Sequence, residues 1–294
     1  MEFMFDLIAN GLLVGLMYSL VALGFVLIYK ATSVINFAQG DLLMFAGYAA
    51  AVMTGGQGMP LWAMVLVLCA GMIVLGFVLE RGILRPMVGQ PVVSVIMVTI
   101  GLSFVLQGLV TIIWGANTRE LALPVRFDPY IVGPVYISPI NLVAAVIAIL
   151  FLIAFGVFFT RSRLGVAMRA VADDQQASMV VGIKVPRVFA LSWAIAGLAA
   201  AAGGIIWGNQ IGVDTFLALV GLKVFPVVIL GGLDSIGGAI IGGLLMGVIE
   251  SLAAGYLDPV VGGGTKDFIP YVLMILVLFV RPYGIFGHET IERV

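Results

Sequence analysis

The chain has 294 residues, of which 62% are hydrophobic and 10% are charged, and its formal net charge is −1. Soluble domains carry about 25% charged residues, so this composition excludes an ordinary soluble protein. The balanced charge also excludes a basic surface for phosphates, and we expect no nucleic-acid partner. Cys69 is the one cysteine, so no disulfide or cysteine-rich metal site can form within the chain.

Apolar segments that approach the length of a membrane span run along the whole chain. A spanning helix needs about 20 mostly apolar residues, and the candidate segments are 7–29, 36–54, 61–79, 92–114, 139–159, 188–208, 216–232, 236–256 and 268–280. Lys223 and Pro226 interrupt the seventh, and Arg281 soon follows the ninth, so both are compatible with half-helices or re-entrant pieces. We predict an all-α, polytopic transmembrane helical bundle of about eight to ten spans, including half-helices, in one domain, 1–294.

Lysine and arginine are distributed unevenly between the two sets of loops. With the N-terminus outside, the inner loops hold Lys30, Arg81, Arg85, Arg161, Arg163, Arg169, Lys184, Arg187, Arg281 and Arg293. The outer loops hold Arg119, Arg126 and Lys266. Because cytoplasmic loops are enriched in positive charge, the N-terminus is expected outside and the C-terminus in the cytoplasm. The outer loop 115–138 is expected to be a folded lid or docking surface, or else a connector with a short hairpin.

Two polar segments lie at the edges of apolar runs. The segment "VINFAQGDLLMFAGY" (34–48) contains Asn36, Gln39 and Asp41, and "VILGGLDSIGGAIIGG" (228–243) contains Asp234 and Ser235. Paired glycine-interrupted segments in two parts of a transporter point to internal repeats and a translocation path, so these residues are assigned to a candidate path. The alternative is that the two carboxylates cap the helices that follow them, while the glycines permit close helix packing.

The connector "RSRLGVAMRAVADDQQASMVVGIKVPR" (161–187) concentrates charged residues between two apolar spans. Asp173 and Gln176 have the spacing of a capping box, and Asp174 adds a charge that favours a helix N-terminus. Gly182 suits a left-handed C-cap. We therefore predict a short capped helix from Asp173 to Gly182.

One face of this helix is suited to a protein partner. Ala177, Val180 and Val181 fall at helical spacing and form a small apolar face. A helix on lipid headgroups would carry lysine or arginine and bulky apolar residues, whereas this one offers acids, amides and small aliphatics, which favours a protein groove. The residues assigned to docking are Arg169, Asp173, Asp174, Gln176, Ala177, Val180, Val181 and Gly182.

Two further charged residues, Lys223 and Glu250, lie within predicted spans. A charge at the bilayer centre costs roughly 2.5–3.5 kcal/mol on insertion scales, so the lysine is expected to face protein or water. We add both residues to the candidate path. The alternatives are an ion pair between them, capping of carbonyls by the lysine, and a carboxylate that simply reaches the interface.

No sequence pattern for catalysis is present. The chain has no P-loop and no HExxH motif, and His288 is its only histidine. We therefore expect that the chain is not an enzyme, has no metal site and binds no cofactor. Energy for uphill transport would have to come from another subunit.

Four segments resemble the permease subunits of bacterial branched-chain amino acid ABC transporters, and the chain is most similar to the shorter of the two permeases in those systems. They are "INFAQGDLLMFAGY" (35–48), "LERGILRPMVG" (79–89), "RSRLGVAMRAVADDQQASMVVGI" (161–183) and "GLKVFPVVILGGLDSIGGAIIGG" (221–243). The resemblance extends over essentially the whole chain, in the expected order.

The resemblance implies an ABC importer permease fold and a heterodimer with a second homologous permease in the bacterial inner membrane. It also implies two cytoplasmic ATPase subunits, which bind ATP and Mg, and a periplasmic substrate-binding protein. The segment 161–187 matches the family's ATPase-docking loop. The N-terminus would then be periplasmic, and membrane lipid would surround the subunit.

Three positions depart from the family pattern. Gln39 stands where His is frequent, Asp41 where Glu is frequent, and Pro226 where small residues are common. Related permeases carry urea, short amides or aromatic acids, so branched-chain amino acids are the expected substrates and urea or short amides are the alternative. An ion-coupled secondary transporter is the alternative from another class, and its candidate relay residues are Lys223 and Glu250.

Overall fold

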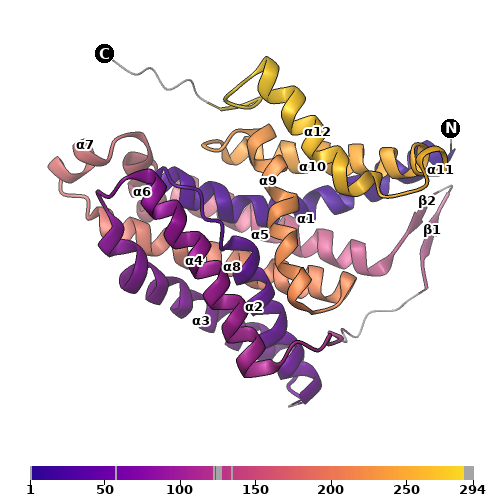
Figure 1. Cartoon of the computed structure of the whole chain (residues 1–294), viewed down its shortest axis with the longest axis horizontal. Coiled ribbons are helices and arrows are strands. Elements are labelled where there is room, and N and C mark those ends of the chain that lie inside the picture. Colours follow the sequence, from indigo (N-terminus) through magenta and orange to yellow (C-terminus); the bar gives the residue numbers. More distant parts are fainter. Residues whose placement is uncertain (1, 57, 122, 124–127, 134, 288–294) are drawn as a thin grey trace. The chain divides into compact units, whose positions relative to one another are not determined.

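The computed structural model describes residues 2–56, 58–121, 123, 128–133 and 135–287, and helices dominate it (Figure 1). The main apolar helices are α1 (Glu2–Thr32), α2 (Gln39–Ala51), α3 (Leu61–Leu79), α4 (Val92–Trp114), α5 (Pro139–Arg161), α8 (Val185–Ile211), α9 (Leu219–Gly231), α10 (Ile236–Tyr256) and α12 (Thr265–Val280). Shorter elements connect them: η1 (Val52–Gly56), η2 (Glu80–Leu84), η3 (Arg85–Met87), α6 (Arg163–Asp173), α7 (Gln175–Val180), η4 (Thr215–Ala218) and α11 (Asp258–Val261). The predicted helical architecture is confirmed.

The helices differ in whether they are long enough to cross a membrane. Within the described residues, six are: α1, α3 with its η2–η3 extension, α4, α5, α8 and α10. The helices α2 and α9 have 13 residues each, and α12 has 16. At 1.5 Å per residue these three reach about 20–24 Å, short of a hydrocarbon core of about 30 Å. The seventh and ninth segments are therefore short helices, as anticipated, and so is the second.

Two span boundaries have local physical causes. The second predicted span, 36–54, becomes helical only at Gln39, because the Asn36 side chain accepts a hydrogen bond from the Ala38 N–H at 3.1 Å and stabilises a turn. The seventh predicted span is continuous through Pro226. Proline is tolerated in a membrane helix where neighbouring groups satisfy the freed backbone.

The described chain forms two compact units, and the larger is built around α8. This unit comprises Leu27–Leu123 and Leu150–Gly221. In an apolar 18-residue stretch of α8, 78% of the residues are buried, whereas the corresponding share is 22% in α3 and 22% in α4. Helix α8 is therefore a core helix, and the apolar faces of α3 and α4 are of the kind that lipid covers.

Glycines bring the backbones of this unit close together. A Cβ at Gly204 of α8 would lie 2.6 Å from the Leu43 carbonyl oxygen of α2. A Cβ at Gly76 of α3 would lie 2.5 Å from the Trp193 carbonyl oxygen of α8. Side chains at these positions would clash, so the absence of a Cβ permits the close packing that holds membrane helices together.

The second unit comprises Met1–Val26, Pro124–Ile149 and Leu222–Val294. Its helix α10 packs against the first part of α1, where a Cβ at Gly243 would lie 2.8 Å from the Gly15 carbonyl oxygen. A hairpin of β1 (Tyr130–Val132) and β2 (Val135–Ile137) is joined to α1, because the Asp6 carboxylate accepts the Tyr136 N–H at 2.7 Å. The short hairpin that was one alternative for the loop 115–138 is present. Residues 122, 124–127 and 134 of that loop lie outside the described residues.

Candidate functional site

The connector between α5 and α8 forms two short helices, α6 and α7. Ser162 caps α6, because its Oγ accepts the Gly165 N–H at 2.8 Å. Met168 and Val171 are buried, with 4% and 1% of their surface exposed. A Cβ at Gly165 would lie 2.6 Å from the Phe158 carbonyl oxygen. Helix α6 therefore packs closely against the end of α5 and supports α7, which follows it.

The predicted helix from Asp173 to Gly182 begins differently in the structure. Asp173 is the last residue of α6, and α7 begins at Gln175. Asp174 is the N-cap, and its Oδ1 accepts the Ala177 N–H at 2.9 Å. The capping box predicted between Asp173 and Gln176 is wrong, because the chain becomes extended at Asp174 (φ −156°, ψ 110°) and the cap moves one residue along.

The C-terminal end of α7 has the predicted left-handed glycine. Gly182 has a φ of +87°. Its N–H donates to the Met179 carbonyl at 3.0 Å, and the Ile183 N–H donates to the Ser178 carbonyl at 2.9 Å. This pair of hydrogen bonds is a Schellman motif, which glycine adopts without a Cβ penalty. Both ends of α7 are therefore fixed by local contacts.

The predicted docking face of α7 is open. Val180 and Val181 are 87% and 75% exposed, and Gln176 and Ala177 are exposed beside them. Ser178, on the other side of the helix, is buried. The helix thus presents small apolar side chains away from the protein.

Arg169 has a different position from the other residues assigned to docking. Its guanidinium donates a hydrogen bond to the Phe159 carbonyl at the end of α5 and lies 5.4 Å from the centroid of the Phe159 ring. A cation stabilises both the unsatisfied carbonyls of a helix C-terminus and an aromatic face. Arg169 therefore positions α6, and its direct contact with a partner stays a prediction.

Gln175 was not among the predicted site residues. Its Nε2 donates a hydrogen bond to the Ala31 carbonyl near the end of α1 at 3.0 Å. The last carbonyls of a helix have no partner within the helix, so a side-chain amide is well suited to bind there. This hydrogen bond connects the first residue of α7 directly to α1.

The three predicted path residues at the start of α2 are buried and hydrogen-bonded. Asn36, Gln39 and Asp41 are 1%, 0% and 3% exposed. The Gln39 amide donates to the Ala196 carbonyl at 3.2 Å, and the Gln107 amide donates to Asp41 Oδ1 at 2.8 Å. Asp41 does not cap α2, whose N-cap residue makes no side-chain hydrogen bond, so that alternative is wrong.

Two residues of α4 complete this cluster and were missed by the sequence analysis. The Thr99 hydroxyl accepts the Phe37 N–H at 3.4 Å, and Gln107 binds Asp41 as described. Thr99 and Gln107 are eight residues apart in an apolar span, so they share one face of a helix. That spacing of polar side chains was the available signal.

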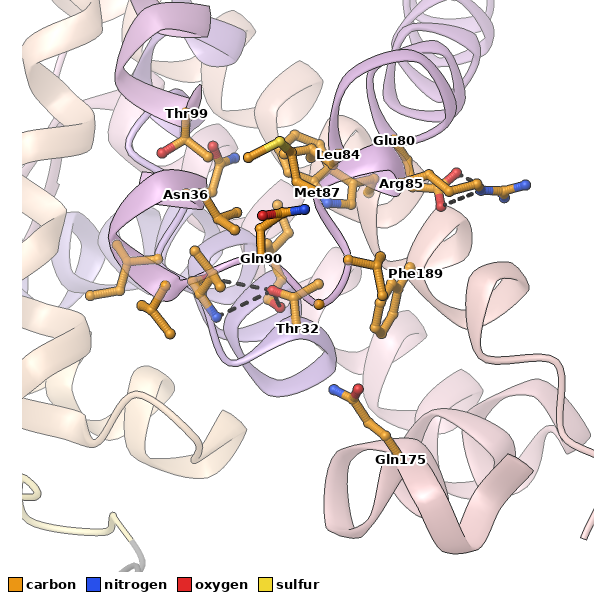
Figure 2. A pocket seen from close by; sticks show the side chains of 18 residues that line it. Thr32, Asn36, Glu80, Leu84, Arg85, Met87, Gln90, Thr99, Gln175 and Phe189 are labelled. Carbon is orange, nitrogen blue, oxygen red and sulfur yellow. Dashed lines mark hydrogen bonds and ion pairs between the residues drawn. The ribbon is translucent and has the colours of Figure 1, made fainter. Parts of the chain in front are cut away.

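A pocket of about 150 Å³ opens beside the cluster (Figure 2). Asn36 and Thr99 line it together with Gln90 from the turn before α4 and Phe189 from α8. Further residues of the wall include Thr32, Glu80, Leu84, Arg85, Met87, Gln175 and Trp193. The pocket therefore combines an apolar lining with several amides, hydroxyls and one ion pair.

The ion pair of this wall is formed by Glu80 and Arg85. Glu80 is buried, and its two carboxylate oxygens accept hydrogen bonds from Arg85 Nε and Nη2, each at 3.1 Å. A bidentate pair of this kind fixes the geometry of both groups. The arginine side chain is 41% exposed, so it remains within reach of water.

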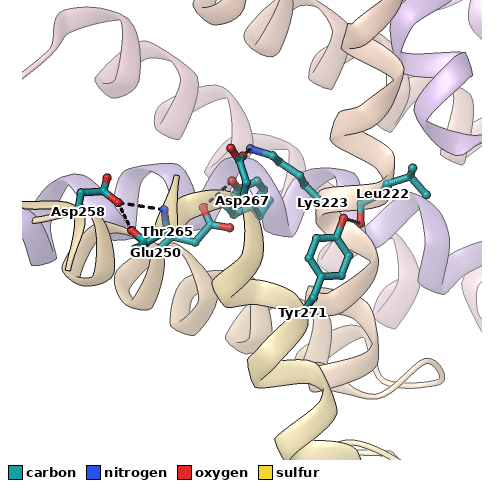
Figure 3. Close-up of polar contacts among 8 residues, drawn as sticks. Leu222, Lys223, Glu250, Asp258, Thr265, Asp267 and Tyr271 are labelled. Atoms are coloured by element: carbon teal, nitrogen blue, oxygen red, sulfur yellow. Dashed lines mark hydrogen bonds and ion pairs between the residues drawn. The ribbon is translucent and has the colours of Figure 1, made fainter. Parts of the chain in front are cut away.

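A second polar cluster lies in the other unit (Figure 3). Lys223 forms an ion pair with Asp267, and their side chains are 34% and 70% exposed. Glu250 instead accepts a hydrogen bond from the Tyr18 hydroxyl at 2.7 Å, and its other oxygen has no hydrogen-bond partner within the described residues. The predicted alternative of a Lys223–Glu250 pair is wrong, because the lysine pairs with α12.

Asp258 closes the turn between α10 and α12. It accepts hydrogen bonds from the Thr265 hydroxyl and from the Thr265 N–H, the latter at 2.9 Å (Figure 3). These two hydrogen bonds, the hydroxyl first, lower the pKa of Asp258 below its ordinary value because they favour the ionised form.

Ser235 rather than Asp234 caps α10. The Ser235 Oγ accepts the Gly238 N–H at 3.0 Å. The predicted capping role of Asp234 is therefore wrong, since the cap lies one residue later. The predicted role of the glycines is confirmed, because a Cβ at Gly242 would lie 2.8 Å from the Val227 carbonyl oxygen.

Comparison with known families decides what kind of protein carries these features. The family described as "Branched-chain amino acid transport system / permease component" matches residues 7–278. The chain belongs to this family. The permease is 34% identical to the high-affinity branched-chain amino acid transport system permease protein LivH of Escherichia coli (strain K12), over 97% of this chain and 96% of LivH. It is 35% identical to the corresponding protein BraD of Pseudomonas aeruginosa, over 98% and 97% of the two chains.

A solved structure also resembles this permease. It is a chain of PsaBC from Streptococcus pneumoniae, determined in complex with Fab, with a TM-score of 0.52 and 12% identity over 94% of this chain and 92% of that chain. This likeness concerns the fold alone. Family membership and the likeness together confirm the predicted ABC permease fold. The chain is a multi-pass membrane protein of a transport family and not an enzyme.

The predicted path residues of this permease fall into two sets. Asn36, Gln39 and Asp41 belong to the unit around α8, whereas Lys223, Asp234, Ser235 and Glu250 belong to the other. Within the described residues, no group of three or more His, Cys, Asp or Glu side chains could hold a metal ion.

Proposed function

We propose that this permease is a subunit of an ATP-driven ABC importer and forms part of the translocation path for branched-chain amino acids. The observation that carries the proposal is α7, a short helix with both ends capped and its apolar face exposed. A helix that receives force from a partner must hold its shape and offer side chains that fit a groove. The exposed Val180 and Val181 meet the second requirement, and the caps meet the first.

The partners of this subunit would be a second homologous permease, two cytoplasmic ATPase subunits and a periplasmic substrate-binding protein. The ATPase subunits would bind ATP and Mg, since the sequence contains no P-loop. Membrane lipid would cover the exposed faces of α3 and α4. The names of LivH and BraD, which describe permease proteins of transport systems, support this assembly.

The orientation follows from the distribution of positive charge. We place the subunit in the bacterial inner membrane with a periplasmic N-terminus and a cytoplasmic C-terminus. The connector 161–187 then lies on the cytoplasmic side, where ATPase subunits can reach the exposed face of α7. The turn containing Glu80 and Arg85 lies on the same side.

The candidates for the translocation path are polar and charged residues in and beside the apolar helices. Polar and charged groups within membrane spans are costly and tend to face a cavity or a water-filled path. Asn36, Gln39 and Asp41 are the candidates in the unit around α8. Lys223, Asp234, Ser235 and Glu250 are those in the other unit. The partners Gln107 and Asp267 would orient Asp41 and Lys223.

The substrate proposal rests on the relatives. LivH and BraD are named for branched-chain amino acid transport, and identity extends over nearly the whole of each chain. Urea or short amides are the alternative substrates. A thermal-shift screen of amino acids, urea and amides on the cognate binding protein distinguishes them, and stabilisation by urea or an amide alone would contradict the amino acid proposal.

The docking role is tested by Val180→Asp. Losing a hot-spot side chain costs about 2 kcal/mol or more, and a buried unpaired charge adds a desolvation cost, so we expect the variant to lose most of its ATPase association and ATP-driven uptake. Co-purification of the ATPase and uptake in proteoliposomes measure the two effects. Val260→Asp is the control, because Val260 is 83% exposed on α11 and lies far from the connector in sequence.

Two results would contradict the proposal. Normal ATPase association and uptake in Val180→Asp would show that α7 is not part of the docking contact. Uptake that persists in proteoliposomes without any ATPase subunit would favour an ion-coupled transporter.

A further inference from the structure

The pocket of Figure 2 is enclosed by segments that the proposed orientation places on the cytoplasmic side. It lies at the end of α1, at the start of α4, beside the η2–η3 turn and at the start of α8, and Gln175 of α7 reaches its wall. All of these segments belong to one compact unit. The pocket is therefore a feature of this subunit by itself.

The volume and lining of the pocket suit a small branched aliphatic group. A cavity of about 150 Å³ is large enough for a benzene-sized body. Leu84, Met87 and Phe189 form apolar parts of the wall. Ligand sites combine such walls with a few polar groups that fix orientation.

The polar groups of the wall suit a zwitterionic head. The buried carboxylate of Glu80 has acceptor capacity beyond its two hydrogen bonds, and Arg85 has further N–H donors beyond the two that bind Glu80. The Gln90 side chain lines the pocket and is exposed, and its amide can both donate and accept hydrogen bonds. The Glu80 carboxylate can therefore accept a hydrogen bond from an ammonium group, and the Gln90 amide can donate one to a carboxylate, whereas the Arg85 guanidinium points away from Gln90 (Figure 2).

The pocket is physically connected to the docking helix. Gln175 lines the pocket and also donates a hydrogen bond to the Ala31 carbonyl at 3.0 Å. It is the first residue of α7, next to the N-cap Asp174. A ligand that contacts Gln175 would favour one arrangement of α7, and by linkage a change in α7 would alter the affinity of the pocket.

We propose that this pocket binds an intracellular branched-chain amino acid, and that its occupancy restrains α7 and lowers ATP-driven uptake. The proposal rests on the proposed function for the orientation of the pocket and for the class of amino acid. Product that accumulates in the cytoplasm would thus slow its own import. The ligand is recognised by its aliphatic side chain and by both charges of its head.

Direct binding is tested on the assembled transporter in detergent, without ATP and without the binding protein. Titration with L-leucine is expected to show saturable binding by calorimetry or by tryptophan fluorescence, to which Trp193 in the wall contributes. Leucinamide and isocaproate each lack one charge of the zwitterion and should bind more weakly. Gln90→Leu removes one hydrogen-bonding group and should weaken leucine binding about tenfold.

The regulatory effect is tested by uptake into proteoliposomes that contain ATP and increasing L-leucine inside, with loaded binding protein outside. The measured quantity is the ratio of initial rates with and without internal leucine for each variant, so a change in basal rate does not enter. Wild type should show a ratio that falls with internal leucine. Gln90→Leu and Gln175→Leu should need about tenfold more leucine for the same fall.

Thr111→Val is the matched control for Thr99→Val. Both threonines lie on α4 and donate to a carbonyl of their own helix at 2.9 Å, but only Thr99 lines the pocket. Thr99→Val should weaken the leucine effect, and Thr111→Val should leave it unchanged. This contrast separates loss of the pocket from a general change in α4.

Several outcomes would overturn the proposal. One is the absence of leucine binding to the assembled transporter, which does not depend on uptake. Another is a wild-type ratio that stays constant up to millimolar internal leucine. A third is equal inhibition in wild type, Gln90→Leu and Gln175→Leu. Failure of the proposed function would be a different result. In that case wild type would show no ATP-driven uptake even when the proteoliposomes contain no leucine.

Discussion

A single guanidinium group accounts for both hydrogen bonds to the buried carboxylate of Glu80. The Glu80 side chain is 2% exposed, and Arg85 binds both of its carboxylate oxygens. Breaking a buried pair from one side leaves an uncompensated charge, which costs more than losing the pair as a whole. The main effect of the pair is therefore to fix the geometry of the turn between α3 and α4.

Arg85→Leu should lower the free energy of unfolding by about 1–3 kcal/mol, less than for a fully buried pair because the arginine is partly exposed. Thermal unfolding in detergent measures the change. Arg81→Leu is the control on the same turn, since Arg81 is exposed, and should change stability by less than about 0.5 kcal/mol. Equal effects of the two substitutions would show that the pair has no special role.

The contact between Asp258 and Thr265 should make the α10–α12 turn sensitive to acid. Because the folded state lowers the pKa of Asp258, stabilisation is complete above its ordinary value of 3.8 and is lost as pH falls through the lowered value. Hydrogen exchange of the turn should therefore be slower in wild type than in Asp258→Asn at neutral pH. The difference should disappear under acid conditions, and a difference independent of pH would contradict the assignment.

At the scale of elements, close packing of α3 on α8 depends on particular glycines. A Cβ at Gly76 would lie 2.5 Å from the Trp193 carbonyl oxygen, whereas a Cβ at Gly71 on the same helix meets nothing within 4 Å. The abundance of glycine predicted close packing but could not distinguish these two positions. Which glycine faces a backbone depends on how the two helices cross.

Gly76→Ala should therefore destabilise the permease by roughly 1–3 kcal/mol, because the added methyl group overpacks the contact. Gly71→Ala should be neutral or should stabilise α3 by about 0.5–1 kcal/mol, because alanine has less backbone entropy to lose. Thermal unfolding of the two purified variants provides the comparison. Equal melting temperatures would contradict the observed approach of α3 to α8.

Elements of the connector show how far local sequence signals extend. The predicted left-handed Gly182 and the apolar positions Val180 and Val181 are found in the structure, because caps and helical spacing are local properties. The N-cap is Asp174 rather than Asp173. Two adjacent acids satisfy the same local rule, and only the packing of α6 decides where its last helical residue lies.

At the scale of the whole molecule, the proposed orientation predicts which segments a membrane-impermeant thiol reagent reaches. Cys69→Ser removes the one native cysteine. In that background Val180→Cys should be labelled only from the cytoplasmic side, and Val260→Cys only from the periplasmic side. Both valines are highly exposed, at 87% and 83%, so accessibility does not limit labelling. The reverse labelling pattern in intact cells would show that the orientation is opposite to the one proposed.

Hydropathy and charge by themselves determined the membrane class, the position of the spans and the proposed orientation. The segments 61–79, 92–114 and 236–256 coincide with α3, α4 and α10, because a bilayer requires a continuous apolar run that any single sequence displays. The polar residues at the start of α2 were also recognisable, since polar and charged groups within a predicted span are rare.

The partners of those residues were decided only by the tertiary structure. Asp41 binds Gln107, Lys223 pairs with Asp267 rather than Glu250, and Gln175 connects α7 to α1. Each contact joins residues that are far apart in the chain, so no local pattern encodes it. Burial forces each polar group to find a hydrogen-bond partner, but which partner it finds depends on how the helices pack.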